Sequence, residues 1–209
     1  MRMDRRVVVL GGLSVAAAGP AASQNPTWAM QLIKAATAQI GVTTIYDPAY
    51  QRLSFPGGDV PRDRGVCTDV VVRAYRDAFG VDLQALVNTD MRANFARYPT
   101  RWGLKTPDAN IDHRRVPNLR IFFARQGGEQ PVPGTLDDWQ PGDLVTQELS
   151  PPGGPRSAPP HIGIVSDKLV PGSQRRLVIH NIGAGTREED ILGAWRVTGR
   201  YRWPPPGRT

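Results

Sequence analysis

The sequence predicts an α+β fold in which helices come first and a small antiparallel sheet follows. In the first part of the chain, apolar residues recur at helical spacing. After a turn at residues 140–143, short runs of apolar and β-branched residues are separated by proline and glycine turns. No internal repeat or change in composition marks a domain boundary. We therefore expect a single domain over residues 24–203, long enough to enclose a proper hydrophobic core.

Both ends of the chain differ in composition from this domain. Two adjacent arginines precede an apolar run at residues 7–18, and small residues at 21–23 fit a cleavage site. Residues 1–23 are therefore predicted to be a secretory signal peptide, with general or twin-arginine export left open. No later stretch is long and apolar enough to span a bilayer. We expect a periplasmic or extracellular protein with a disordered tail at residues 204–209.

Charge and cysteine content narrow the possible partners. The net charge of +7 suits an anionic partner such as cell wall, lipopolysaccharide or acidic lipid, although a merely soluble basic surface explains it equally well. The arginines are scattered and not interleaved with aromatic residues in one segment, which argues against nucleic acid. Cys67 is the only cysteine, so it cannot form an internal disulfide. We expect the protein to be a monomer.

Four helices are predicted from start signals, apolar stripes and stop signals. Residues 42–65 and 99–117 lie between them and have the composition of loops, and the first of these loops could form one wall of a cleft. The expected starts are Asn25–Pro26, Cys67, Asp82 and Pro117, and the expected stops are Gly41, Gly80 and Gly127–Gly128. The expected inward-facing residues are Trp28, Leu32, Ile33, Ala36 and Ile40, then Val70, Val71, Ala74 and Phe79, then Leu83, Leu86, Val87, Met91 and Phe95, and finally Leu119, Phe122 and Phe123.

The strands follow in the second part of the chain. A turn around Pro171 and Gly172 joins two of them, which predicts an antiparallel pair. The proline-rich residues 150–160 precede this pair and are expected to form a mobile surface loop. The predicted strands are residues 144–146, 161–166, 176–181 and 194–203.

Three residues point to thiol chemistry. Cys67 is expected in the first turn of a helix, where free amide hydrogens and the helix dipole lower the pKa of a thiol. His161 opens one strand of the antiparallel pair and His180 ends the other, so both histidines should lie at the same edge of the sheet. With Cys67 packed on that edge, His161 would take the thiol proton and His180 would orient His161. Asn181 is the alternative third member, since neighbouring residues of a strand face opposite sides.

Two other interpretations of these residues stay open. Cys67 alone is equally well explained as a buried, inert small hydrophobe. Cys67, His161 and His180 could also bind a catalytic zinc ion. The chain has no His-Glu-x-x-His motif and no Cys-x-x-Cys motif, which favours the thiol mechanism over a metal site.

The order of these features resembles the NlpC-type cell-wall cysteine peptidases, a papain-like clan. Gly41 and Tyr46 come first, then a loop with two adjacent glycines, the cysteine at a helix start, a Pro-Gly-Asp turn and a His-Ile-Gly-Ile-Val strand. The match is closer still to a bacterial family within that clan, domain of unknown function 1287. It covers about residues 28–203, and the stretches that carry it are residues 65–70, 112–119, 161–167 and 178–185.

The resemblance implies a papain-like fold with N-terminal helices packed on the sheet. It also implies a secreted cysteine hydrolase that cleaves an amide bond in peptidoglycan, as a stem-peptide endopeptidase or an amidase, without a metal or organic cofactor. Cys67 would be the nucleophile, His161 the general base and His180 the third, polar member. The residues expected to contact substrate are Tyr46, Thr68, Asp69, His113 and Arg114.

Some positions depart from the clan pattern and leave alternatives. Val66 replaces the usual acidic residue before the cysteine, and Thr68 replaces the serine after it, so the reaction class carries over better than the exact bond. A non-catalytic envelope-binding module or a thiol transacylase would fit the same residues. His113, with Arg114 and Arg115, could bind substrate carboxylates in the cleft or belong to a solvated charged loop.

Overall fold

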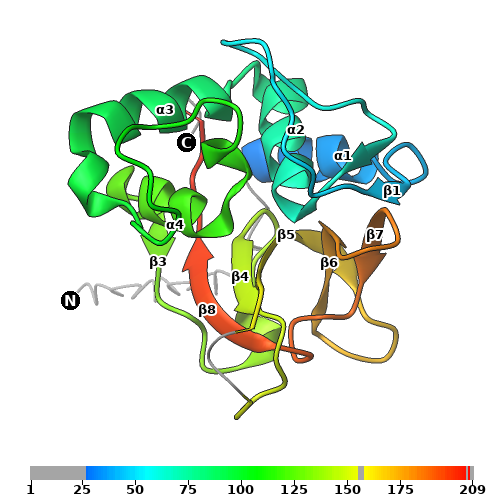
Figure 1. Ribbon diagram of the computed structural model, residues 1–209. Coiled ribbons are helices and arrows are strands. Elements are labelled where there is room, and N and C mark those ends of the chain that lie inside the picture. Colours follow the sequence, from blue (N-terminus) through cyan, green and yellow to red (C-terminus); the bar gives the residue numbers. More distant parts are fainter. Residues whose placement is uncertain (1–26, 155–157, 206, 208–209) are drawn as a thin grey trace, which may run out of the picture.

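A computed structural model describes residues 27–154, 158–205 and 207 (Figure 1). The fold is α+β, as predicted, with the helices gathered on one side of an antiparallel sheet. The predicted signal peptide and the cap at Asn25–Pro26 lie outside the described residues. Within the described residues, no helix is both long enough and apolar enough to cross a membrane.

The four expected helices are present. Gly80 ends the second in the left-handed conformation, at a φ of 69°, and Asp82 caps the third through the backbone N–H of Gln84. The α-helices are α1 (Thr27–Thr37), α2 (Cys67–Phe79), α3 (Leu83–Asn94) and α4 (Val116–Arg125). Short 3-10 turns are η1 (Phe95–Arg97), η2 (Asp112–Arg114) and η3 (Leu136–Asp138).

Two of the expected core positions are wrong. Ile40 is exposed because α1 already ends at Thr37, and the following turns carry Ile40 away from the stripe. Leu86 of α3 is also exposed, because the helix packs through one narrow side. Phe95 lies beyond α3 in η1, where it is partly buried and packs against the core, as expected.

The main sheet has six strands in the order β3-β8-β4-β5-β6-β7, and every pair in it is antiparallel. The sequence predicted four of these strands but neither β3 nor β7, which carry almost no apolar side chains. Two further short strands pair in parallel within the segment expected to be loop. The bounds are β1 (Ile45–Tyr46), β2 (Arg64–Gly65), β3 (Glu129–Gln130), β4 (Leu144–Glu148), β5 (Pro160–Leu169), β6 (Arg176–Asn181), β7 (Thr186–Glu189) and β8 (Arg196–Tyr201).

The two faces of the sheet bury different sets of residues. Ile162 and Ile164 of β5 belong to the large core beneath the helices. Val165 belongs to a smaller cluster on the opposite face, together with Val178 of β6. Because side chains alternate along a strand, His161 and His180 share the face of the smaller cluster.

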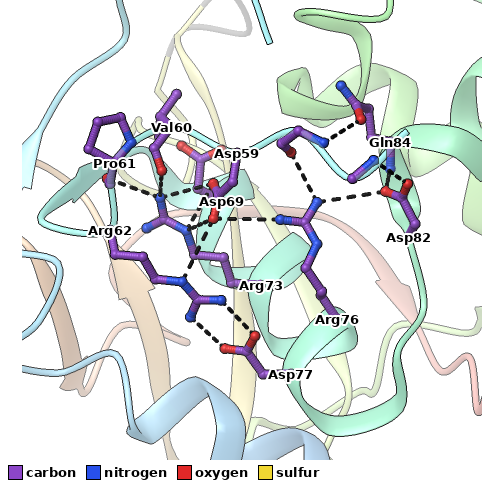
Figure 2. A network of polar contacts seen from close by, with 12 residues as sticks. Asp59, Val60, Pro61, Arg62, Asp69, Arg73, Arg76, Asp77, Asp82 and Gln84 are labelled. Atoms are coloured by element: carbon purple, nitrogen blue, oxygen red, sulfur yellow. Dashed lines mark hydrogen bonds and ion pairs between the residues drawn. The ribbon is translucent and has the colours of Figure 1, made fainter. Parts of the chain in front are cut away.

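A buried arginine holds the segment that leads into α2. Arg73 of α2 is fully buried, and its guanidinium donates to Asp59 at 2.9 Å and to the carbonyl of Val60 at 3.0 Å (Figure 2). It also donates to the carbonyl of Arg64 at 3.0 Å. These bonds provide hydrogen-bond donors for carbonyl groups that have no partner within a β-sheet. The loop over residues 57–65 is therefore fixed to the helix that it precedes.

The end of the described chain packs against the helices. The Tyr75 hydroxyl donates to the carbonyl of Trp203 at 2.8 Å, and Trp203 is buried. Pro205 is buried too, so the packed chain reaches two residues beyond the expected domain boundary at residue 203. Residues 206, 208 and 209 of the expected tail lie outside the described residues.

Candidate active site

Cys67 is the first residue of α2, and the turn before it is tightly held. The Asp69 carboxylate accepts a hydrogen bond from the backbone N–H of Val66 at 2.7 Å, which is half of a capping box. Gly65 allows this approach, since a Cβ there would lie 2.9 Å from Asp69 Oδ2. Asn181 of β6 donates to the carbonyl of Gly65 at 3.0 Å and ties the turn to the sheet.

Burial raises the pKa of the Cys67 thiol to about 11, so the expectation of a lowered pKa is wrong. The helix start does supply hydrogen bonds that favour a thiolate, from the backbone N–H groups of Cys67 and Thr68 and also of Ile162 on β5. Loss of water around the sulfur outweighs them. The thiol is therefore protonated at neutral pH, and it lies at the backbone N–H of Ile162, the residue that follows His161 on β5.

The two histidines meet, as their positions on the antiparallel pair predicted. His161 Nε2 lies 3.1 Å from His180 Nδ1. His180 Nε2 in turn lies 3.1 Å from Oε2 of Glu189, a residue of β7 that the sequence analysis did not single out. Glu189 pairs across the ladder with Val178, so it sits diagonal to His180, within reach of a long side chain.

This chain of contacts sets the tautomer of both rings. A carboxylate only accepts hydrogen bonds, so His180 carries its proton on Nε2 and leaves Nδ1 as an acceptor. His161 must then donate from Nε2, which leaves its own Nδ1 unprotonated and able to accept a proton. Asn181 is engaged with Gly65, so the side chain that meets His161 is that of His180.

The histidine pair is shielded from water. His161 and His180 are almost fully buried, and both rings contact the edge of Trp195, with ring centroids 5.7 and 6.3 Å away. Burial lowers the pKa of His161 to about 3 and also lowers that of His180, although Glu189 opposes the second shift. Both imidazoles are therefore neutral at physiological pH.

A cleft of about 280 Å³ opens beside Cys67. Its lining is partly apolar and includes three arginines and no carboxylate among the residues that the structure describes. Burial raises the pKa of the Tyr46 hydroxyl, and Tyr46 lines the cleft together with Cys67. The lining residues are Tyr46, Pro48, Val66, Cys67, Arg101, Trp102, Ile111, Arg114, Arg115, Val116, Pro117 and Pro160.

Comparison with known proteins places the chain in a family. The model of the family described as domain of unknown function 1287 matches residues 33–203. The chain belongs to this family. A relative from Escherichia coli K12, the uncharacterized protein YijF, is 53% identical over 165 residues, which are 79% of this chain and 77% of YijF.

A solved structure shares the fold of this family member. It is the crystal structure of an N-acetylmuramoyl-L-alanine amidase from Bacteroides uniformis, with a TM-score of 0.50. The match covers 84% of this chain and 98% of the amidase, at 12% identity. At that identity the likeness concerns the fold, a mixture of helices and antiparallel sheet.

Of the five residues expected to bind substrate, Tyr46 and Arg114 line the cleft, and three do not. Thr68 is fully buried, and its hydroxyl donates to the carbonyl of Arg114 at 3.1 Å. Asp69 is buried and paired with Arg114, with Nε and Oδ1 2.8 Å apart. His113 is buried outside the lining, where loss of water lowers its pKa to about 4.

The alternative of a solvated charged loop over residues 112–115 is wrong, because Asp112, His113 and Arg114 are buried and η2 packs against α2, α3 and α4. Sequence reasoning missed Arg101 and Trp102, which reach the cleft from the polar segment before η2. A tryptophan flanked by arginine in that segment was the available signal. In the part of the chain that is described, no three His, Cys, Asp or Glu side chains are grouped to hold a metal ion.

Proposed function

We propose that this family member is a secreted cysteine hydrolase that cleaves an amide bond in peptidoglycan, with a papain-like, NlpC-type active site. The observation that supports it most is the chain of contacts from His161 through His180 to Glu189, beside a helix that begins with Cys67 at a cleft. The shared fold with an amidase adds weaker support. Export through a signal peptide at residues 1–23 and action as a monomer are parts of the same proposal.

The neutral starting state defines the first chemical step. The Cys67 thiol and the His161 imidazole are both uncharged, so the proton moves when the substrate arrives. No hydrogen bond joins the Cys67 sulfur to the His161 ring among the contacts of the described residues, so substrate binding has to bring Nδ1 of His161 to the thiol. The sulfur then attacks the carbonyl carbon of the amide while Nδ1 takes the thiol proton. Negative charge then develops on the carbonyl oxygen, where the backbone N–H of Cys67 and the Tyr46 hydroxyl would donate hydrogen bonds.

The remaining steps return the enzyme to its starting state. The His161 imidazolium gives its proton to the leaving amine as the carbon–nitrogen bond breaks, and an acyl thioester on Cys67 remains. Water then attacks the thioester with His161 as general base, the sulfur leaves and regains a proton, and a carboxylic acid is released. His180 holds the ring of His161, and Glu189 balances the positive charge that forms on the pair.

The test is digestion of purified peptidoglycan by the mature protein and by its Cys67→Ala variant. We expect soluble fragments only from the intact protein, and their masses identify the bond that is cut. Circular dichroism of the variant controls for folding, which should be retained because alanine fits the space of the thiol. Equal fragments from both proteins would refute the mechanism.

One observation favours a non-catalytic binding module instead. The thiol is buried and its pKa is raised, which is the condition of an inert cysteine. Alkylation rates separate the two functions, because a catalytic thiol should react in a way that depends on His161. A rate that is unchanged in His161→Ala, together with measurable binding to peptidoglycan, would favour the module. Product analysis with an added amine acceptor would detect a transacylase.

A further inference from the structure

Two arginines and a tryptophan form one wall of the cleft. The guanidinium carbons of Arg101 and Arg115 lie 4.9 and 4.1 Å from the ring centroid of Trp102, and all three residues line the cleft. Stacking on an aromatic ring holds a guanidinium flat and leaves its N–H groups at the rim free to bind an anion. We call these three residues the arginine wall.

The carboxylates near the cleft do not neutralise this wall. Asp69 is taken by Arg114, and Asp112 accepts from Arg115 Nη1 at 2.8 Å. Arg115 still has donors beyond that single bond, since a guanidinium carries five N–H groups. Arg101 has no carboxylate partner among the salt bridges of the described residues. The wall therefore keeps at least one uncompensated positive charge.

The first turn of α4 adds to the same field. Arg115 is the N-cap of this ten-residue helix, and no side chain caps it. Val116 and Pro117, the first helical residues, line the cleft. The positive end of the helix dipole thus reinforces the charge of the arginines at the site where an anion would bind.

We propose that the arginine wall is a carboxylate-binding subsite, and that the substrate is an acidic peptide with a free carboxylate close to the amide that Cys67 attacks. This inference rests on the proposed function and deepens it by stating the substrate class. Arg101 and Arg115 bind the carboxylate, and Trp102 sets the orientation of both guanidinium groups. Arg114, which the sequence suggested for this role, also lines the cleft, but its guanidinium is paired with Asp69.

The test uses a matched pair of probes and a protein that cannot turn over. The probes are a peptidoglycan stem peptide with free carboxylates and the same peptide with those groups converted to carboxamides. Isothermal titration calorimetry with the Cys67→Ala variant should give a dissociation constant about tenfold lower for the carboxylate peptide. The preference should shrink as ionic strength rises, because Arg101 is exposed to solvent.

Variants assign the preference to the wall. In the Cys67→Ala background, Arg101→Gln should lose affinity for the carboxylate probe, so that the two dissociation constants converge. Arg97→Gln is the matched control, because Arg97 is exposed, lies outside the lining and carries the same charge. It should keep the preference. Loss of the preference in Arg97→Gln as well would mean that net charge, and not the wall, binds the probe.

The possible failures are distinguishable. Equal affinity for the two probes, or no binding of the carboxylate probe at millimolar concentration, would overturn the subsite whatever the enzyme does. A retained preference that depends on Arg101, without any cleavage that depends on Cys67, would support the subsite and refute the hydrolase.

Discussion

Cys67 and His161 both lose water when the fold closes around them, and their pKa values move in opposite directions. The pKa of the Cys67 thiol rises to about 11 and the pKa of the His161 imidazole falls to about 3, so neither group is charged in the resting protein. A preformed ion pair is therefore absent from this site, and substrate binding has to accompany proton transfer. Glu189 is important for this step because it stabilises the positive charge that the histidine pair carries only during the reaction.

At the residue scale, we predict that Glu189→Gln slows peptidoglycan cleavage by about ten- to a hundredfold. A glutamine can present its N–H₂ to His180 Nε2, which favours the opposite tautomers along the pair and leaves His161 Nδ1 protonated. Initial rates against pH are the measurement. Glu188→Gln is the control, since Glu188 accepts from Lys168 and Ser166 and not from the histidines. Equal rates in Glu189→Gln and the unaltered protein would contradict the relay.

At the element scale, α2 carries the nucleophile and also fixes the loop that leads to it. Arg73 joins the helix to residues 57–65 through Asp59 and backbone carbonyls, while Arg76 donates to the carbonyl of Gly58 at 3.0 Å (Figure 2). The same helix thereby carries the thiol and fixes the loop that leads to its N-cap.

We predict that Arg73→Met lowers the free energy of unfolding by about 3–5 kcal/mol, because it removes the hydrogen bonds of Arg73 to Asp59 and leaves the carbonyls of Val60 and Arg64 without this donor. Urea unfolding followed by circular dichroism measures it. Arg62→Met is the matched control, since Arg62 pairs with Asp77 at 2.6 Å near the surface and its side chain is 47% exposed. Arg62→Met should lower the free energy of unfolding by less than about 1 kcal/mol. Similar losses of unfolding free energy in the two variants would show that the buried Arg73 contributes no more to stability than the exposed Arg62.

At the scale of the whole molecule, buried histidines couple stability to pH. Burial holds the pKa of His113 at about 4 and that of His161 at about 3, below the value of about 6.5 expected in the unfolded chain. The unfolded state therefore binds more protons between these values. The stability from neutral burial is complete above about pH 6.5 and falls as the pH drops toward the folded values.

We predict that the free energy of unfolding falls by about 1.5 kcal/mol per buried histidine between pH about 6.5 and about 5. Urea unfolding at both pH values is the measurement. His113→Gln should show a smaller loss on acidification, because it removes one of the titrating groups from a site outside the cleft. If His113→Gln kept the full pH dependence, His113 would not be among the groups responsible.

Local signals determined much of the fold from the sequence. Gly80 and Asp82 are helix-capping residues, and Gly172 forms a turn. Their effect depends on a few neighbouring residues, so the helix ends and the antiparallel pair were predictable. The same locality placed Cys67 at a helix start and brought His161 to His180, because strand direction alone decides which ends meet.

Only the tertiary structure decided how these groups behave. Glu189 belongs to the site because the register of β7 against β6 places it diagonally across from His180. The polar sequence of β7 contains no local pattern from which this register could be predicted. The residues near Arg114 turned inward, because η2 packs on helices that are distant in sequence. The protonation of Cys67 and His161 depends on how much water the surrounding chain removes, which the residue type at one position does not reveal.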